Sequence, residues 1–170
     1  MKIVATIGLG ANLDDPATHV EHAIAELDRL PATRLLARSR LYVSAPVDCT
    51  DQPDFVNAVA QVETTLAPRA LLAALLDIEH RHGRERNFRN APRTLDLDLL
   101  LYGDACFHEP GLELPHPRMH MRAFVLQPLL EIAAHIVIPG RGRAADWLAA
   151  CADQIVTPLP LPAPTASACA

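Results

Sequence analysis

The amino-acid sequence predicts an α+β fold, a ferredoxin-like sandwich with a mostly antiparallel sheet and helices packed on one face. Three observations support this class. Residues 55–65 alternate between two faces, two other segments carry apolar residues at helical spacing, and the element order is strand–helix–strand–strand–helix–strand. The chain has 170 residues, 50% of them hydrophobic and 21% charged, which suits one globular domain with a sizeable core.

The N-terminal part of the chain is expected to form one strand and one helix. Residues 3–9 are an apolar run that predicts a buried strand, and the glycine-containing segment 8–13 predicts a turn. Asp15 is a typical N-cap residue and Pro16 suits the first helical position, so a helix is expected to begin here and end near Leu30. The apolar residues at helical spacing inside it are Val20, Ala23, Ile24 and Leu27.

Two more strands and a second helix are expected before the middle of the chain. A second strand is expected over 35–44, the turn-rich segment 45–53 predicts a loop, and 55–65 predicts a third strand. Pro68 is expected to begin a helix that ends near Gly83 and carries an apolar stripe of Leu71, Leu72, Leu75 and Ile78. The third strand carries Phe55, Asn57, Val59 and Gln61 on one face and Val56, Ala58, Ala60 and Val62 on the other.

The C-terminal part is expected to complete a single domain over 1–156. A hairpin is expected over 105–114, a helix over 124–134 with a break or restart at Pro128, and a last helix over 143–152. Residues 157–170 are rich in proline and alanine, which favours a mobile tail over a packed element.

Charge limits the partners that this chain can bind. The formal net charge of −5 argues against a general nucleic-acid binder, because such proteins present a broad basic surface. Lys2 is the sole lysine, and this skew fits either a compositional bias or a use of arginine for bidentate phosphate contacts. A dense arginine cluster in an acidic chain favours a small polyanion as ligand. Its members are Arg81, Arg84, Arg86, Arg89 and Arg93.

Cysteine spacing and hydropathy indicate the compartment. The four cysteines form no C-x-x-C pair, so we expect reduced thiols and neither a disulfide framework nor a zinc site. No apolar run is long enough to cross a membrane, and the first residues do not resemble a signal peptide. We therefore expect a cytoplasmic protein without a membrane partner. We also expect a monomer, because no second amphipathic surface stands out.

The segment 91–100 carries the strongest chemical signal. Asp96 and Asp98 are two residues apart on a predicted strand, so their carboxylates project from the same face. Two such carboxylates with arginines just upstream suit a metal-bound polyphosphate, although an ordinary solvent-facing strand also accommodates two acids. The opposite face carries four leucines that would anchor the strand in a core. They are Leu95, Leu97, Leu99 and Leu101.

Four segments, in this order, resemble the 6-hydroxymethyl-7,8-dihydropterin pyrophosphokinase family of folate biosynthesis. They are Gly-Leu-Gly-Ala-Asn-Leu (8–13), Asp-Gln-Pro-Asp-Phe-Val-Asn-Ala (51–58), Pro-Arg-Thr-Leu-Asp-Leu-Asp (92–98) and Leu-Pro-His-Pro-Arg-Met (114–119). The resemblance runs over about 3–138. It implies an enzyme that transfers a pyrophosphoryl group from ATP, its co-substrate, to the hydroxymethyl group of a reduced pterin and releases AMP.

The resemblance implies catalytic and metal-binding roles for four residues. Asp96 and Asp98 match the family's metal pair, which holds two Mg²⁺ ions, while Arg84 and Arg93 match catalytic-loop arginines. Ala91 stands where the family often has tryptophan, and the loop is one residue shorter.

The resemblance also implies the substrate-binding residues. The pterin is expected to contact Ser44, Ala45, Val47, Phe55, Asn57 and Phe124. The ATP is expected to contact Glu79, Arg84, Arg86, Arg93, His116 and Arg122. From the residues alone, Phe124 also suits an ordinary core position and Glu79 a salt bridge at a helix end.

Two other classes of function remain compatible with the residues. A ligand-binding module without catalysis would need the pocket but not both carboxylates. A metal-dependent phosphodiesterase would use the carboxylates but would leave Phe55 and Asn57 unexplained. The segment 8–13 matches neither a P-loop nor a dinucleotide fingerprint, so arginines and metals are expected to hold ATP.

Overall fold

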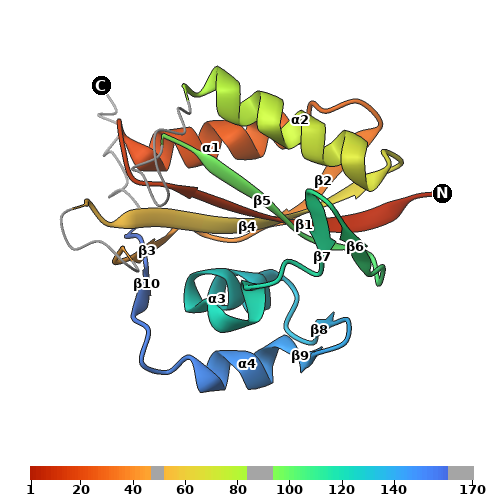
Figure 1. The fold of residues 1–170 in the computed structure, drawn as a ribbon. Coiled ribbons are helices and arrows are strands. Elements are labelled where there is room, and N and C mark those ends of the chain that lie inside the picture. Colours follow the sequence, from red (N-terminus) through yellow and green to blue (C-terminus); the bar gives the residue numbers. More distant parts are fainter. Residues whose placement is uncertain (47–51, 84–93, 161–170) are drawn as a thin grey trace, which may run out of the picture.

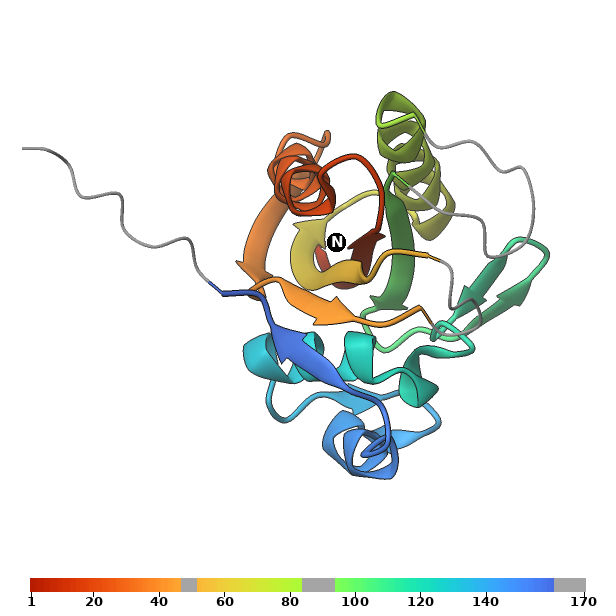
Figure 2. The ribbon, with the colours of Figure 1, turned by 90° about the vertical axis from the view of Figure 1, so that its left-hand side faces the viewer.

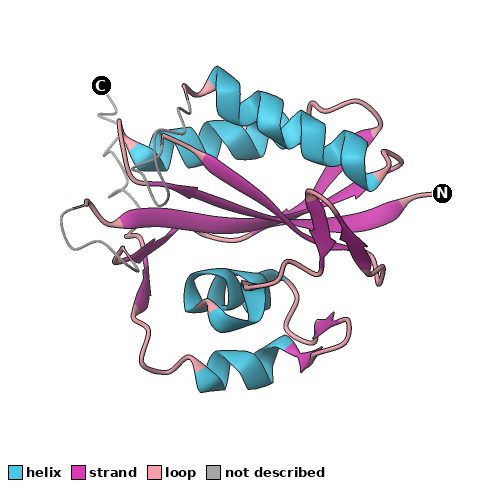
Figure 3. Cartoon of the chain, viewed as in Figure 1, coloured by secondary structure: helices cyan, strands magenta, loops and turns pink. Residues whose placement is uncertain are grey.

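The computed structural model describes residues 1–46, 52–83 and 94–160. A six-stranded sheet lies at its centre, with helices on both faces (Figures 1 and 3). The strands of this sheet are β1 (Ile3–Ala11), β2 (Thr33–Arg38), β3 (Tyr42–Ser44), β4 (Phe55–Thr64), β5 (Asp96–Tyr102) and β10 (Val156–Pro158). The helices are α1 (Pro16–Leu27), α2 (Pro68–Arg81), the 3-10 helix η1 (Met119–Met121), α3 (Ala123–Ile132) and α4 (Ala144–Ala150). α1 and α2 lie on one face of the sheet, α3 lies on the other, and α4 packs against the far side of α3. Two small hairpins are formed by β6 (Phe107–Glu109) with β7 (Leu112–Leu114), and by β8 (Val137–Ile138) with β9 (Gly142–Arg143).

The described strand pairs are all antiparallel, as the sequence predicts for most of the sheet. The order is β10-β3-β4-β1-β5, and β2 pairs with the C-terminal half of β4, residues 60–64. β4 and β1 therefore occupy the middle of the sheet, with β5 at one edge. Figure 2 shows the C-terminal strand β10 running beside β3. The sheet thus reaches Pro158, inside the segment expected as a tail, and 161–170 lie outside the described residues.

The strand expected over 35–44 is two strands, because Ser39 interrupts it. The Ser39 N–H donates to the Val59 carbonyl (2.9 Å), while the Val59 N–H donates to the Ser39 hydroxyl oxygen (3.0 Å). Next to it, the Arg40 N–H donates to a carboxylate oxygen of Glu131 (2.6 Å). Between the end of β2 and the start of β3, side-chain hydrogen bonds therefore replace part of the backbone ladder to β4. Both strands stay paired with β4.

Helices on both faces of the sheet correct the expectation that helices pack on one face. α1 and α2 cover one face, and their predicted apolar stripes are buried there. The opposite face carries Val59, Leu100 and Leu101, which form a second buried cluster with residues of α3, and α4 packs on α3 from outside (Figure 1). Apolar side chains on both faces require cover on both faces.

The helices in the described part of the chain include none with the length and hydropathy of a membrane-spanning segment.

A bulge changes the last part of β5. The register against β1 shifts between Thr6 and Ile7, where Leu100 is the extra residue. Leu97 and Leu99 belong to the core under α1 and α2, as predicted, but Leu101 joins Leu100 in the core under α3. The expectation that all four leucines share one face is therefore wrong at Leu101.

Two element boundaries and the effect of Pro128 also differ from the sequence prediction. β1 continues to Ala11, so residues 8–11 of the segment expected as a turn are strand, and only 12 and 13 lie outside it. α1 ends at Leu27, and Asp15 supports its start through its backbone carbonyl, while its carboxylate accepts a hydrogen bond from the Thr18 hydroxyl (2.7 Å). Pro128 lies inside α3 without ending it, because the helix is held by the buried residues on either side of the lost hydrogen bond.

Replacing Ser39 with alanine should destabilise the fold. The change leaves the buried N–H of Val59 without its acceptor, so we expect the free energy of unfolding to fall by about 1–3 kcal/mol. Urea denaturation measures this loss. The matched control is Thr18→Val, which removes an exposed hydroxyl hydrogen bond and should cost less than about 0.5 kcal/mol. Equal losses in both variants would contradict the role assigned to Ser39.

Candidate active site

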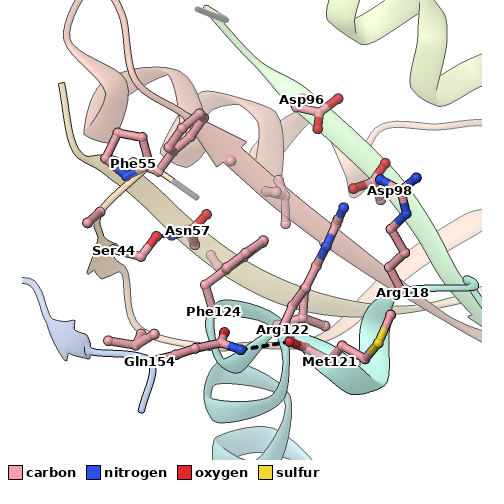
Figure 4. Close-up of a pocket in the computed structure, with 18 of the residues that line it drawn as sticks. Ser44, Phe55, Asn57, Asp96, Asp98, Arg118, Met121, Arg122, Phe124 and Gln154 are labelled. Atoms are coloured by element: carbon pink, nitrogen blue, oxygen red, sulfur yellow. Dashed lines mark hydrogen bonds between the residues drawn. The ribbon is translucent and has the colours of Figure 1, made fainter. Parts of the chain in front are cut away.

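A pocket of about 740 Å³ opens on the α3 side of the sheet (Figure 4). Its floor is β1, where Gly8 and Gly10 line the pocket without side chains. Gly10 is the register partner of both Asn57 on β4 and Asp96 on β5, and Gly8 is the partner of Asp98. The glycines therefore separate an amide on one wall from two carboxylates on the other.

The carboxylate wall is formed by Asp96 and Asp98, which point into the pocket from β5 as predicted (Figure 4). Leu97, which lies between them in the sequence, and Leu99, which follows Asp98, point into the core on the opposite face. They are 3% and 5% exposed. Buried Glu79 on α2 accepts a hydrogen bond from the Leu97 N–H (2.7 Å). Core packing and this hydrogen bond together determine where the carboxylates lie.

A metal at this wall would need ligands from another source. Among the described residues, no group of three or more histidine, cysteine, aspartate and glutamate side chains is arranged to hold a metal ion. Mg²⁺ commonly binds one or two protein carboxylates and completes its shell with phosphate oxygens and water. The pair Asp96 and Asp98 fits that donor set.

The opposite wall combines aromatic rings with one oriented amide. Phe55 reaches the pocket from β4 and Phe124 from α3 (Figure 4). The Asn57 side chain is 4% exposed, and its Nδ2 donates to the Ser44 hydroxyl (2.7 Å). This hydrogen bond leaves Oδ1 toward the floor, where a Cβ added at Gly10 would lie 3.2 Å from it. A flat heterocycle with polar edges suits this wall.

Basic residues lie beside the carboxylate wall (Figure 4). Arg118 and Arg122 line the pocket, and the Arg122 guanidinium carbon lies 5.5 Å from the centroid of the Phe124 ring. His116 is half-buried beside them, and its Nδ1 accepts a hydrogen bond from the Arg118 N–H (3.2 Å). Burial lowers the pKa of His116 to about 4, the Arg122 charge adds to the lowering, and the Asp96 carboxylate opposes it.

The end of β1 fixes one edge of the pocket. Asn12 is 2% exposed, and its Nδ2 donates to the Gln52 side-chain oxygen (3.0 Å) and to the Pro53 carbonyl (3.3 Å). Gln52 itself lines the pocket. The segment 8–13 therefore positions Gln52 at the pocket in addition to forming the floor.

The structure brings most of the described candidate residues together. Lining the pocket are Ser44, Ala45, Phe55, Asn57, Asp96, Asp98, Arg122 and Phe124. Glu79 and His116 do not line it; Glu79 instead supports the strand that carries the aspartates. Predictions for Val47, Arg84, Arg86 and Arg93 fall outside the described residues.

Sequence reasoning missed several pocket residues, among them Arg118 and the segment 153–156. Arg118 lies inside a quoted motif, so its position there was an available signal. The segment 153–156 also lines the pocket, but no pattern in the sequence marks it. Only the pairing of β10 with β3 brings that segment to the site.

Comparison with known proteins gives a consistent result. The family model described as 7,8-dihydro-6-hydroxymethylpterin-pyrophosphokinase (HPPK) matches residues 6–134. The 2-amino-4-hydroxy-6-hydroxymethyldihydropteridine pyrophosphokinase of Pseudomonas aeruginosa is 46% identical over 154 residues, which is 91% of this chain and 95% of that protein. The protein of the same name from Haemophilus influenzae is 46% identical over 152 residues, which is 89% of this chain and 95% of that protein.

Solved structures support the fold. The wild-type HPPK-DHPS of Plasmodium falciparum with pteroate matches with a TM-score of 0.69 at 12% sequence identity. The match covers 88% of this chain and 42% of that longer chain. At this identity the likeness concerns the fold alone, and it agrees with the α+β class predicted from the sequence.

The His116 imidazole should stay neutral from about pH 8 to about pH 5, because its pKa in the folded protein is about 4. In the unfolded chain a histidine takes up its proton near pH 6.5. Its contribution to stability is therefore complete above about pH 6.5 and is lost as the pH falls toward 4. The Cε1–H signal in NMR spectra, assigned with His116→Asn, measures the pKa. A titration midpoint near 6.5 would contradict the prediction, and Arg122→Gln should raise the midpoint.

Proposed function

The chain belongs to the 7,8-dihydro-6-hydroxymethylpterin-pyrophosphokinase family, and from this membership we propose that it pyrophosphorylates 6-hydroxymethyl-7,8-dihydropterin with ATP. The hydroxymethyl oxygen forms a bond to the β-phosphorus of ATP. The bond from that phosphorus to the oxygen bridging it to the α-phosphate breaks, the hydroxyl proton is released, and AMP leaves. The partners on this proposal are two small molecules.

The observation that carries the proposal is the pairing of two chemically different walls across the glycine floor. Phe55, Phe124 and the Asn57 amide suit a flat heterocycle with donors and acceptors on its edge. Asp96 and Asp98 face the other side of the same pocket and suit a metal-bound polyphosphate. Both substrates of a pyrophosphoryl transfer must meet in one place, and this pocket offers a surface for each.

Two Mg²⁺ ions would be held by Asp96 and Asp98, together with phosphate oxygens and water. When bound, the ions would neutralise charge on the phosphates and help align them. The protein's own contribution is the geometry of the carboxylates, which depends on the leucine core behind β5 and on the Glu79 hydrogen bond to Leu97.

The phosphates of ATP would contact Arg122 and His116 in the described part of the chain. With a pKa of about 4, the His116 imidazole is neutral at pH 7 before ATP binds, and its ring N–H could donate a hydrogen bond to a phosphate oxygen. By resemblance, Arg84, Arg86 and Arg93 would add positive charge, and Glu79 would lie close to the nucleotide. The backbone groups of Ser44, Ala45 and Val47 would bind the edge of the pterin.

The first test is AMP formation from ATP and Mg²⁺, with and without 6-hydroxymethyl-7,8-dihydropterin. Pterin-dependent AMP together with a recovered pterin pyrophosphate supports the proposal. AMP formation without pterin would indicate a hydrolase. Pterin binding without any AMP would indicate a binding module.

Removing one carboxylate should abolish most of the activity. Asp96→Asn lowers the negative charge available to the metal, so we expect turnover to fall by at least about 100-fold while pterin binding persists. Turnover is measured as AMP release, and pterin affinity by calorimetry. The matched control is Asp104→Asn, an exposed acid just beyond β5, which should retain activity. Near-normal turnover in Asp96→Asn would refute the role of this residue.

Replacing Ser44 with alanine should weaken pterin binding through Asn57. The change removes the acceptor of the Asn57 amide, which then loses its fixed orientation, and we expect the KM for pterin to rise by roughly 5- to 20-fold. Ser39→Ala is the matched control, because that buried hydroxyl bonds only to backbone groups away from the pocket. A similar rise in both variants would show that lost stability, not amide orientation, is the cause.

A further inference from the structure

The C-terminal segment forms part of the pocket, although it follows the region that the family model matches. The model matches residues 6–134, whereas Asp153, Gln154, Ile155 and Val156 all line the pocket. The segment reaches the site because β10 pairs with β3 beside α3. The family match therefore leaves open what these residues contribute.

Gln154 joins the backbone on both sides of Arg122. Its side-chain oxygen accepts a hydrogen bond from the Ala123 N–H (2.9 Å), and its Nε2 donates to the Met121 carbonyl (2.8 Å; Figure 4). Although the Gln154 side chain is exposed, both ends of its amide are thus engaged with backbone. One planar group holds the residues before and after Arg122.

Arg122 stands at the junction that this amide bridges. It is the N-cap of α3 with an extended backbone (φ −121°, ψ 106°), and its carbonyl accepts hydrogen bonds from the N–H groups of Val125 and Leu126 (both 3.0 Å). Its side chain leaves this point toward the pocket and lies over Phe124 (Figure 4). A change in the backbone at the junction would redirect the guanidinium.

The turn before Arg122 is also braced by the C-terminal part of the chain. The His120 ring contacts the Trp147 ring edge-to-face, with centroids 4.7 Å apart, and the Cys151 thiol lies 3.9 Å from the His120 carbonyl. His120 is 5% exposed. The segment from α4 to Gln154 therefore fixes the turn at several points, and only Gln154 contacts the backbone on both sides of Arg122.

We propose that Gln154 is a positioning residue that sets the direction of Arg122 toward the phosphates of ATP. The inference rests on the proposed role of Arg122 at ATP. A guanidinium makes directional hydrogen bonds, so a small displacement of its backbone weakens its contacts with phosphate. By holding the junction in place before the ligand arrives, Gln154 reduces the reorganisation that binding would otherwise require.

The test is a double-mutant cycle between Gln154 and Arg122. Gln154→Met keeps the size of the side chain and removes both hydrogen bonds, and we expect it to raise the KM for ATP roughly tenfold with a smaller change in kcat. Arg122→Ala should raise the same KM by at least roughly tenfold. In the Arg122→Ala background, Gln154→Met should add little, because the group that it positions is gone.

Two further variants separate positioning from general stability. Gln61→Met is the matched control, since Gln61 bonds to the Thr6 hydroxyl (3.4 Å) and does not line the pocket, and its KM for ATP should be unchanged. Gln154→Glu retains the acceptor for the Ala123 N–H and loses the donor to Met121, so its effect should be intermediate. It also provides a measurement if Gln154→Met folds poorly.

An NMR measurement without substrates tests the geometry independently. The Nε–H signal of Arg122, identified by its loss in Arg122→Lys, should shift or broaden in Gln154→Met and remain unchanged in Gln61→Met. An unchanged signal, or an equal KM increase in both backgrounds of the cycle, would overturn the inference. If Arg122→Ala leaves the KM for ATP unchanged, the proposed ATP contact fails instead, and the NMR result still decides whether Gln154 positions Arg122.

Discussion

The arrangement of the site depends on the absence of side chains at two positions in the middle of the sheet. Gly8 and Gly10 lie on β1 between Asn57 on one neighbouring strand and Asp96 and Asp98 on the other. Glycine in a strand weakens it, because it has more backbone freedom to lose and no side chain to pack. Here the cost is offset on the opposite face, where alternate β1 residues are buried in the core. β1 can therefore be buried in the core through one face and form the floor of the pocket with the other.

That division requires the sheet to be covered on both faces. The core under α1 and α2 holds β1, β4 and β5 in register, so the carboxylates and the amide keep their separation across the floor. The cluster under α3 fills the second face beyond the pocket, where Val59 follows Asn57 along β4 and Leu100 and Leu101 follow Asp98 along β5. The β5 bulge directs Leu101 into this cluster. The pocket is thus the part of the second face that apolar side chains leave unfilled.

Local patterns in the sequence accurately predicted the elements whose signal is local. The stripes of α1 and α2, the two faces of β4 and the common face of Asp96 and Asp98 follow from helical and strand periodicity, which depends only on neighbouring residues. The break at Ser39 was not predictable in this way, because it depends on a hydrogen bond to Val59, twenty residues further along the chain. Pro128 gave the opposite error: its local signal indicates a break, and burial of its neighbours in α3 overrides it.

The sequence alone determined the α+β class, the antiparallel character of the sheet and the motifs that identify the family. These depend on the periodicity of apolar residues and on contiguous residues. Tertiary structure decided which side chains meet. It placed the glycines between the carboxylates and Asn57, covered the second face with α3, and brought Gln154 to the backbone around Arg122. The physical reason is that strand register and helix packing join residues far apart in the chain, and no local pattern encodes which distant residue will fill a given position.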